Sequence, residues 1–91
     1  MTTGLNVTDK HLRKLTVYFL KQMAIEDPEY FDTFVSKFTS NPDWIEILNL
    51  RYKQGLKFEI IPDFLSKRKT LRSVFDVHNK FITEVLIHSE I

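Results

Sequence analysis

The chain has 91 residues, of which 43% are hydrophobic and 27% are charged, and its formal net charge at pH 7 is +1. This length suits one domain with a single core, and the composition excludes a disordered chain. The absence of cysteine excludes disulfides and thiolate zinc sites, and only two glycines argue against an all-β fold with tight turns.

The first residues and the lengths of the apolar runs indicate the cellular location of the protein. Residues 1–7 lack a basic stretch followed by an apolar run, so we expect no signal peptide. No run approaches about 18 uncharged apolar residues, so we expect no membrane span. The lack of cysteine fits a reducing compartment, and a cytoplasmic location is therefore expected.

The first helix is predicted over residues 9–24. Thr8 suits the N-cap, because its hydroxyl can accept a hydrogen bond from an unpaired backbone N–H, and residues 1–7 are expected to be flexible. Val17 and Tyr18 leave the predicted core-facing stripe on opposite sides, so this helix is more apolar than one buried face requires. The stripe itself comprises Leu12, Leu15, Phe19, Leu20 and Met23.

The second helix is predicted over residues 28–38, with Asp27 as its N-cap and Pro28 at its first position. Its helical periodicity is the clearest in the chain, since large apolar residues recur at i, i+3, i+4 and i+7. The expected core residues of this helix are Phe31, Phe34, Val35 and Phe38.

The third helix is predicted over residues 42–54. Asn41 and Pro42 repeat the cap and first-turn chemistry of the second helix, and Gly55 suits the position just beyond the end. Arg51 points toward the face that should be buried. It does not deprotonate, so its stem crosses apolar surface, or it pairs with a carboxylate, or it lies at the rim of an interface.

Residues 56–61 are predicted to be extended. Leu56, Phe58 and Ile60 alternate with charged residues, which is a strand pattern, and Ile61 precedes Pro62, which disfavours a helical backbone. The segment is expected to be either an extended crossing or a strand that pairs with another chain.

The last helix is predicted over residues 71–87, after an N-cap at Thr70 and a short turn around Phe64. Short links between helices favour antiparallel neighbours. The fold class is therefore all-α. We expect a single domain over residues 1–91, folded as a compact bundle of about four helices with one short extended segment at 56–61.

Motifs for catalysis, cofactors and metals do not occur in this sequence. The glycines stand at positions 4 and 55, so no phosphate-cradling loop is present, and the acidic residues are scattered. Glu84 and His88 share a helix face but supply two ligands where a metal site needs three or four. We expect no enzyme activity, no cofactor and no metal site.

A cluster of basic residues precedes and opens the last helix. It comprises Lys67, Arg68, Lys69 and Arg72. The cluster is either a solvated loop or a contact for phosphate or nucleic acid, and the second possibility gives the alternative function of a nucleic-acid-binding domain. The near-neutral total charge argues against this alternative.

His78 lies near the centre of the apolar stripe of the last helix. It is expected to be a core histidine with one satisfied hydrogen bond. The functional alternative is a pH-sensitive packing switch, because burial resists protonation of the imidazole.

Apolar residues in excess of the core predict the function. Several of them lie at the edges of the helical stripes and flank more than one helix, which favours a protein interface. We expect a non-enzymatic interaction module, a small regulator or adaptor that docks an apolar helix face on a partner or on itself as a homodimer. The sequence does not identify the partner or the process. The predicted partner-binding residues are Val17, Tyr18, Leu50, Arg51, Val77 and Ile87.

Overall fold

The computed structural model describes residues 10–88 as helices joined by short connections, without a strand in that range, and the all-α class is confirmed. The N-cap predicted at Thr8 and the flexible segment predicted for residues 1–7 lie outside the described residues. The α-helices are α1 (Lys10–Glu26), α2 (Pro28–Ser36), α3 (Pro42–Leu48), α4 (Ile61–Phe64) and α5 (Leu71–His88), with a π-helical turn at Asn49–Lys53 and a 3₁₀ turn at Phe58–Ile60.

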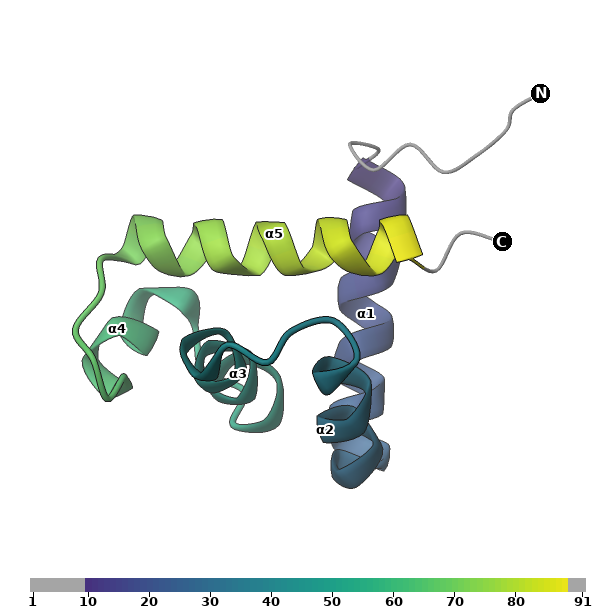
Figure 1. Cartoon of the computed structure of the whole chain (residues 1–91), viewed down its shortest axis with the longest axis horizontal. Helices are drawn as coiled ribbons and strands as arrows, with labels where there is room; N and C mark the ends of the chain where they lie inside the picture. The colour runs from purple at the N-terminus through teal and green to yellow at the C-terminus, as the bar shows by residue number, and fades with distance from the viewer. Residues whose placement is uncertain (1–9, 89–91) are drawn as a thin grey trace.

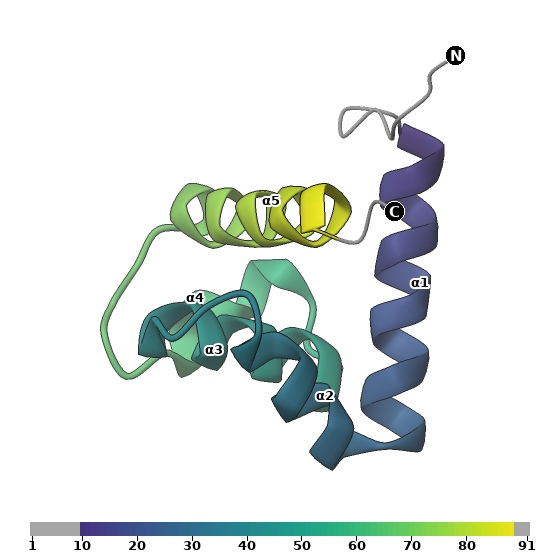
Figure 2. The same cartoon turned by 45° about the vertical axis from the view of Figure 1, so that its right-hand side comes forward.

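The helices do not form a row of antiparallel neighbours. Helix α2 folds back beside α1, whereas α5 crosses α1 steeply near the C-terminal end of α5 (Figures 1 and 2). Helices α3 and α4 lie beneath α5 on the other side of the molecule (Figure 1). Residues 65–70 link α4 to α5, which runs over the top of α3 and reaches α1 (Figure 1).

The main core lies where α1, α2, the π-helical turn and α5 meet. The periodicity predicted for α2 is confirmed in part, since Phe31 and Val35 are buried and Phe34 and Phe38 are half-buried. The buried members of this cluster are Leu20, Met23, Ala24, Phe31, Val35, Leu48, Tyr52, Phe81, Ile82, Val85 and Leu86. Burying one such side chain fully is worth about 1.5–3 kcal/mol.

A second, smaller core lies beneath the first half of α5. Ile47, Ile61 and Val74 are each fully buried there and come from α3, α4 and α5. Half-buried side chains surround them, namely Leu50, Leu56, Phe58, Leu65 and Val77. This cluster packs the segment between α3 and α5 against the inner side of α5.

The predicted helix starts are confirmed by their hydrogen bonds. The Asp27 carboxylate accepts from the Tyr30 N–H at 3.0 Å, and the Asn41 side chain accepts from the Asp43 N–H at 2.8 Å. Thr70 Oγ1 accepts from the Ser73 N–H at 3.1 Å. Each bond satisfies a backbone donor that has no partner within its helix, so these polar residues fix where α2, α3 and α5 begin.

The extended segment predicted at 56–61 is wrong for most of its length. Lys57 is extended, but Phe58–Ile60 forms a 3₁₀ turn, and Ile61 is helical with φ −56° and ψ −42° although Pro62 follows it. The reason is tertiary. Ile61 is fully buried in the second core, and this burial outweighs the local preference of a residue before proline.

Two further differences concern helix geometry. Helix α3 ends at Leu48 and continues as the π-helical turn, so the helix predicted over 42–54 is not α-helical throughout. In α1, the predicted core residues Leu15 and Phe19 are 51% and 53% exposed. The apolar stripe of α1 is therefore divided between the core and the solvent.

The position of Gly55 generates a prediction about stability. Gly55 has φ +72°, and a Cβ added there would meet no atom within 4 Å. Gly55→Ala should therefore lower the free energy of unfolding by about 1 kcal/mol through backbone strain alone. Gly55→Asn should lose less, because asparagine tolerates this conformation better. Chemical denaturation measures both variants, and an unchanged stability for Gly55→Ala would show that the turn relaxes.

Candidate protein-docking site

Helix α1 presents apolar side chains on the side opposite its core face. Leu15, Tyr18 and Ile25 are 51%, 63% and 69% exposed, whereas Leu20 and Ala24 are buried. With 3.6 residues per turn, positions i, i+3 and i+10 share one side of a helix. The outer side of α1 therefore carries exposed apolar side chains, with the polar residue Gln22 between them.

This apolar surface continues from α1 onto α2 through ring contacts. Phe19 and Phe34 meet edge to face with their centroids 6.2 Å apart, and Tyr30 lies 6.3 Å from Phe34 on the same helix. Phe34 also contacts Phe38, at 5.1 Å. We call this surface the α1–α2 face. It comprises Leu15, Tyr18, Phe19, Ile25, Tyr30 and Phe34.

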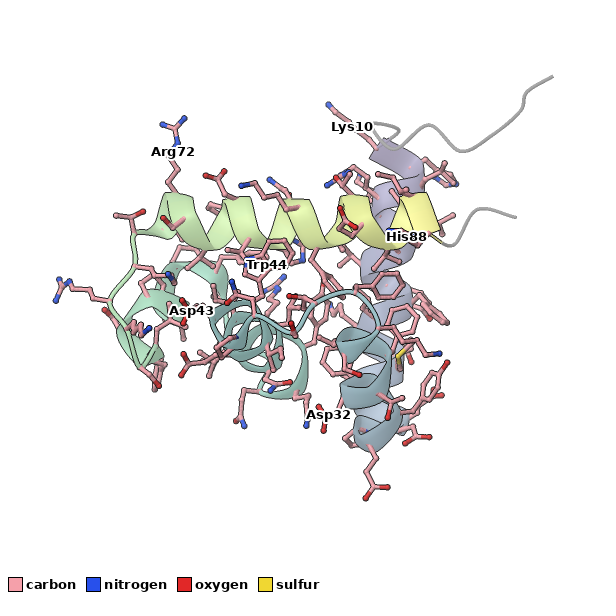
Figure 3. All side chains as sticks on the ribbon, viewed as in Figure 1. Lys10, Asp32, Asp43, Trp44, Arg72 and His88 are labelled. Atoms are coloured by element: carbon pink, nitrogen blue, oxygen red, sulfur yellow. The ribbon has the colours of Figure 1, made fainter. Side chains whose placement is uncertain are left out.

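The α1–α2 face reaches the end of α5. Phe38, the last ring of the chain of contacts, lies 6.0 Å from the His88 ring. Figure 3 shows His88 at the end of α5 where that helix crosses α1. Side chains from three helices therefore border one surface, although α1 and α2 supply its apolar members.

The area of the α1–α2 face falls in the range of interaction sites. An aromatic side chain buries about 150–250 Å², so half-exposed rings present on the order of 100 Å² each and the face on the order of 500 Å². The largest apolar patch of a typical monomer covers about 300–600 Å² and is often functional. A standard interface buries about 800 Å² on each partner, so the face suits a small or transient contact.

A second exposed apolar patch lies at the opposite end of α5. Phe64 of α4 is 59% exposed, and Ile60 and Phe75 are each 39% exposed. Phe75 is anchored by Phe58, whose ring centroid lies 4.9 Å away. This patch has fewer exposed apolar residues than the α1–α2 face, and Phe75 contacts Phe58, which packs against the second core.

The structure does not bring the predicted partner-binding residues together. Tyr18 lies on the α1–α2 face, and Ile87 is 49% exposed in the last turn of α5. Leu50 and Val77 are half-buried against the second core, on the other side of the molecule. Val17 is half-buried where α1 meets α5. A role in partner binding therefore remains a prediction for each, and it is best supported by position for Tyr18.

Helical periodicity does not identify most of the α1–α2 face. It places Leu15 and Phe19 in the core stripe, and it assigns Ile25 and Tyr30 to no surface. The signal that could have found them is the breadth of the apolar arc on α1. A helix that is apolar on two sides needs two partners, and α2 and α5 supply one side only.

Arg51 is held inside the fold. Its Nη1 donates to the Leu56 carbonyl oxygen at 2.9 Å, and its guanidinium carbon lies 4.1 Å from the centre of the Phe58 ring. Arg51 therefore closes the loop after the π-helical turn and stacks on an aromatic ring. Among the roles considered from the sequence, this geometry comes closest to a stem lying across apolar surface.

His78 and Tyr52 form a buried polar pair between the two cores. A hydrogen bond of 2.6 Å joins His78 Nε2 and Tyr52 Oη, and His78 is 7% exposed. Burial, together with the smaller effect of the nearby Arg51 and Arg13 charges, lowers the pKa of His78 to about 4. Burial also raises the pKa of Tyr52 above its usual range. The imidazole is therefore neutral at physiological pH, as expected for a core histidine with one hydrogen bond.

A surface hollow of about 240 Å³ lies at the crossing of α1 and α5. Val17 and Ile82 line it, together with the edge of His78. Arg13 borders the hollow and fastens the crossing, because its guanidinium donates to Thr83 Oγ1 at 3.0 Å and to the Asn79 carbonyl at 2.8 Å. The arginine is thus used to hold the two helices together.

The basic residues of 67–72 do not form one cluster. Lys69 Nζ lies 3.4 Å from an Asp43 carboxylate oxygen, and Arg68 lines a small hollow together with Asp63. Arg72 projects from the far side of α5, away from Asp43 (Figure 3). The segment therefore offers phosphate less positive charge than its sequence suggests.

The polar pair generates a prediction about pH. The folded state keeps His78 neutral down to about pH 4, whereas an unfolded chain protonates it near pH 6.5. The stabilisation is therefore fully present above pH 6.5 and is lost as the pH falls toward 4, by about 3 kcal/mol for a shift of this size.

Two measurements check this pH dependence. An NMR titration of the His78 ring in the folded protein should give a pKa near 4. His78→Gln should flatten the fall in unfolding free energy between pH 6.5 and 4, with the carboxylates still titrating in both proteins. A His78 ring that titrates near pH 6.5 in the native state would contradict the burial argument.

Arg51 generates a prediction about folding. Arg51→Ala removes a charged hydrogen bond and a stacking contact, so it should lower the free energy of unfolding by about 1–3 kcal/mol. Arg51→Lys should recover part of the loss, because a lysine keeps the charge without the planar fork. Denaturation at low protein concentration measures both, and an unchanged stability would return Arg51 to the set of interface candidates.

The basic segment generates a prediction about nucleic acid. Few cations are available to displace counterions from DNA, so duplex binding at physiological salt should stay near ~10⁻⁴–10⁻⁶ M, the non-specific range. Fluorescence anisotropy with labelled duplexes at two salt concentrations measures this. Nanomolar, sequence-selective binding that depends on Arg68 and Arg72 would favour the nucleic-acid function instead.

Within the described residues, no three histidine, aspartate or glutamate side chains gather closely enough to hold a metal ion, and no helix combines the length and apolar character needed to cross a membrane. No protein-family model, curated protein or solved structure matches this chain. The geometry of the α1–α2 face is therefore the basis for assigning a function.

Proposed function

We propose that this chain is a non-enzymatic protein–protein interaction module, a small regulator or adaptor that docks through the α1–α2 face. The observation that carries the proposal is the exposure of Tyr18 and Ile25, at 63% and 69%, on a helix whose other side is already buried. Single exposed apolar residues are common and need no explanation. A contiguous set on two adjacent helices marks an interaction site.

The shape of α1 supports docking of a helical partner. Its 17 residues extend over about 25 Å, since each residue adds about 1.5 Å. Leu15, Tyr18 and Ile25 supply anchors at positions typical of helix-mediated recognition. A helical partner would also contact Phe19 and Phe34, whose rings already pack against each other between α1 and α2.

The cytoplasmic location is part of this proposal and rests on the cysteine-free sequence. The alternative of nucleic-acid binding receives no support from the geometry of the basic segment. Asp43 pairs with Lys69, and Asp63 lines the same small hollow as Arg68 and Lys69, so carboxylates reduce the positive charge that a phosphate would meet there.

Affinity purification from the native host with quantitative mass spectrometry tests the proposal. The double variant Tyr18→Asp/Ile25→Asp should lose its partners by tenfold or more, because it places two charges on the docking surface. The matched control is Phe64→Asp, at a residue of similar exposure in the patch at the other end of α5. The control should retain the partners that the wild-type chain captures.

Folding must be unchanged for this comparison to hold. Substitutions at exposed positions usually alter the free energy of unfolding by no more than about 0.5 kcal/mol, which denaturation of each variant measures. Proteins captured equally by the wild type, the double variant and the control would show that the α1–α2 face is not the docking site.

A further inference from the structure

Charged residues along the α1–α2 face specify the chemistry of its partner. Lys14 stands four residues before Tyr18, and Lys21 stands four residues before Ile25, so each lysine lies beside an exposed apolar side chain of the face. These two lysines form the edge of the face on α1. The described ion pairs involve neither of them.

The opposite edge of the face also carries a lysine. Lys37 follows the end of α2, and its Nζ lies 5.8 Å from the centre of the Tyr30 ring. Tyr30 is in turn joined to the centre of the face through Phe34. The edge of the face on α2 therefore carries one lysine, whereas the edge on α1 carries two.

The end of the face near the turn between α1 and α2 is acidic. Glu26 closes α1 and Glu29 lies in the first turn of α2, and both are exposed. The face thus has two lysine edges and one acidic end. This unequal distribution gives a docked helix a preferred direction, because its own charges must match both features.

We infer that the α1–α2 face binds an amphipathic helix of another protein, in which acidic residues flank the apolar stripe. The inference rests on the proposed function and adds the chemistry of the partner. The apolar stripe of the partner helix covers Leu15, Tyr18 and Ile25. The carboxylates of the partner helix face Lys14 and Lys21 at one edge of the α1–α2 face and Lys37 at the other. The stems of these lysines also cover apolar surface of the bound helix.

A second copy of this chain fits the same surface poorly. If two α1 helices pair antiparallel, the edge with Lys14 and Lys21 meets the same edge of the other copy. If they pair parallel, that edge meets the edge with Lys37. Lysines oppose lysines along the edges in either orientation. An antiparallel pair offsets part of this repulsion, because the acidic end of one copy then approaches the end of the other copy that carries Lys14. The edges of the face therefore match a second copy less well than they match an acidic helix.

Binding of synthetic helical peptides tests the inference on the whole chain. Three fluorescent peptides share one leucine stripe and differ in the flanking residues, which are all glutamate, all glutamine or all lysine. At low salt, the glutamate peptide should bind at least tenfold tighter than the lysine peptide, as measured by anisotropy. The difference should shrink in 0.5 M salt, because exposed charge pairs are screened.

Charge reversal on the protein provides the matched test. Lys14→Glu/Lys21→Glu should reverse the preference, so that the lysine peptide binds tighter than the glutamate peptide. The control Lys57→Glu/Lys67→Glu makes the same change in net charge at exposed lysines outside the face. The control should retain the preference of the wild-type chain, which separates a local edge effect from a total-charge effect.

Four outcomes would overturn the inference. They are equal affinity for the three peptides, no binding of any peptide at millimolar concentration, binding to vesicles containing phosphatidylserine without a preference among peptides, and a dimer in light scattering that Tyr18→Asp dissolves. The affinity purification described above is independent of these outcomes. A partner lost with Tyr18→Asp/Ile25→Asp would leave the proposed function standing when the partner chemistry fails.

Discussion

The inner side of α5 packs against both α1 and α3, and each of the other described elements packs on at least one of these three helices. Phe81 is fully buried, and Ile82, Val85 and Leu86 are nearly so. Because α5 crosses α1 steeply, it covers a limited length of that helix, and α2 covers the flank beside it (Figure 2). The outer side of α1 is left without a neighbour in the described chain, so the same packing that makes the core also makes the α1–α2 face.

The two cores meet at a polar layer instead of merging into one. Tyr52 belongs to the first core, and Phe58 packs against the second. The His78 ring contacts both, with centroids 5.7 Å and 4.9 Å away. A buried polar pair is costly if either partner is removed. The pair therefore fixes how α5 packs on the turn that follows α3. It also makes the stability of this junction dependent on pH, because His78 is buried in its neutral form.

Charged residues near the second core differ in their contacts from the lysines near the α1–α2 face. Around the second core, charged groups are engaged inside the fold: Arg51 with Leu56 and Phe58, and Lys69 with Asp43. Around the α1–α2 face, lysines border apolar surface without a described ion pair. Arg51 and Lys69 therefore take part in contacts within the fold, whereas Lys14 and Lys21 have no described ion pair and suit contact with a partner.

The sequence by itself determined the helical class and the starts of α2, α3 and α5, because a cap depends on a few adjacent residues such as Asp27, Asn41 and Thr70. It also determined the turn at Gly55, since a positive φ favours glycine. Tertiary structure alone decided that Ile61 is helical and that Leu15 and Phe19 face solvent. Helical periodicity identifies the apolar sides of α1, but it does not determine which of them is buried. That depends on where α2 and α5 pack on α1, which is determined by contacts between residues distant in the chain.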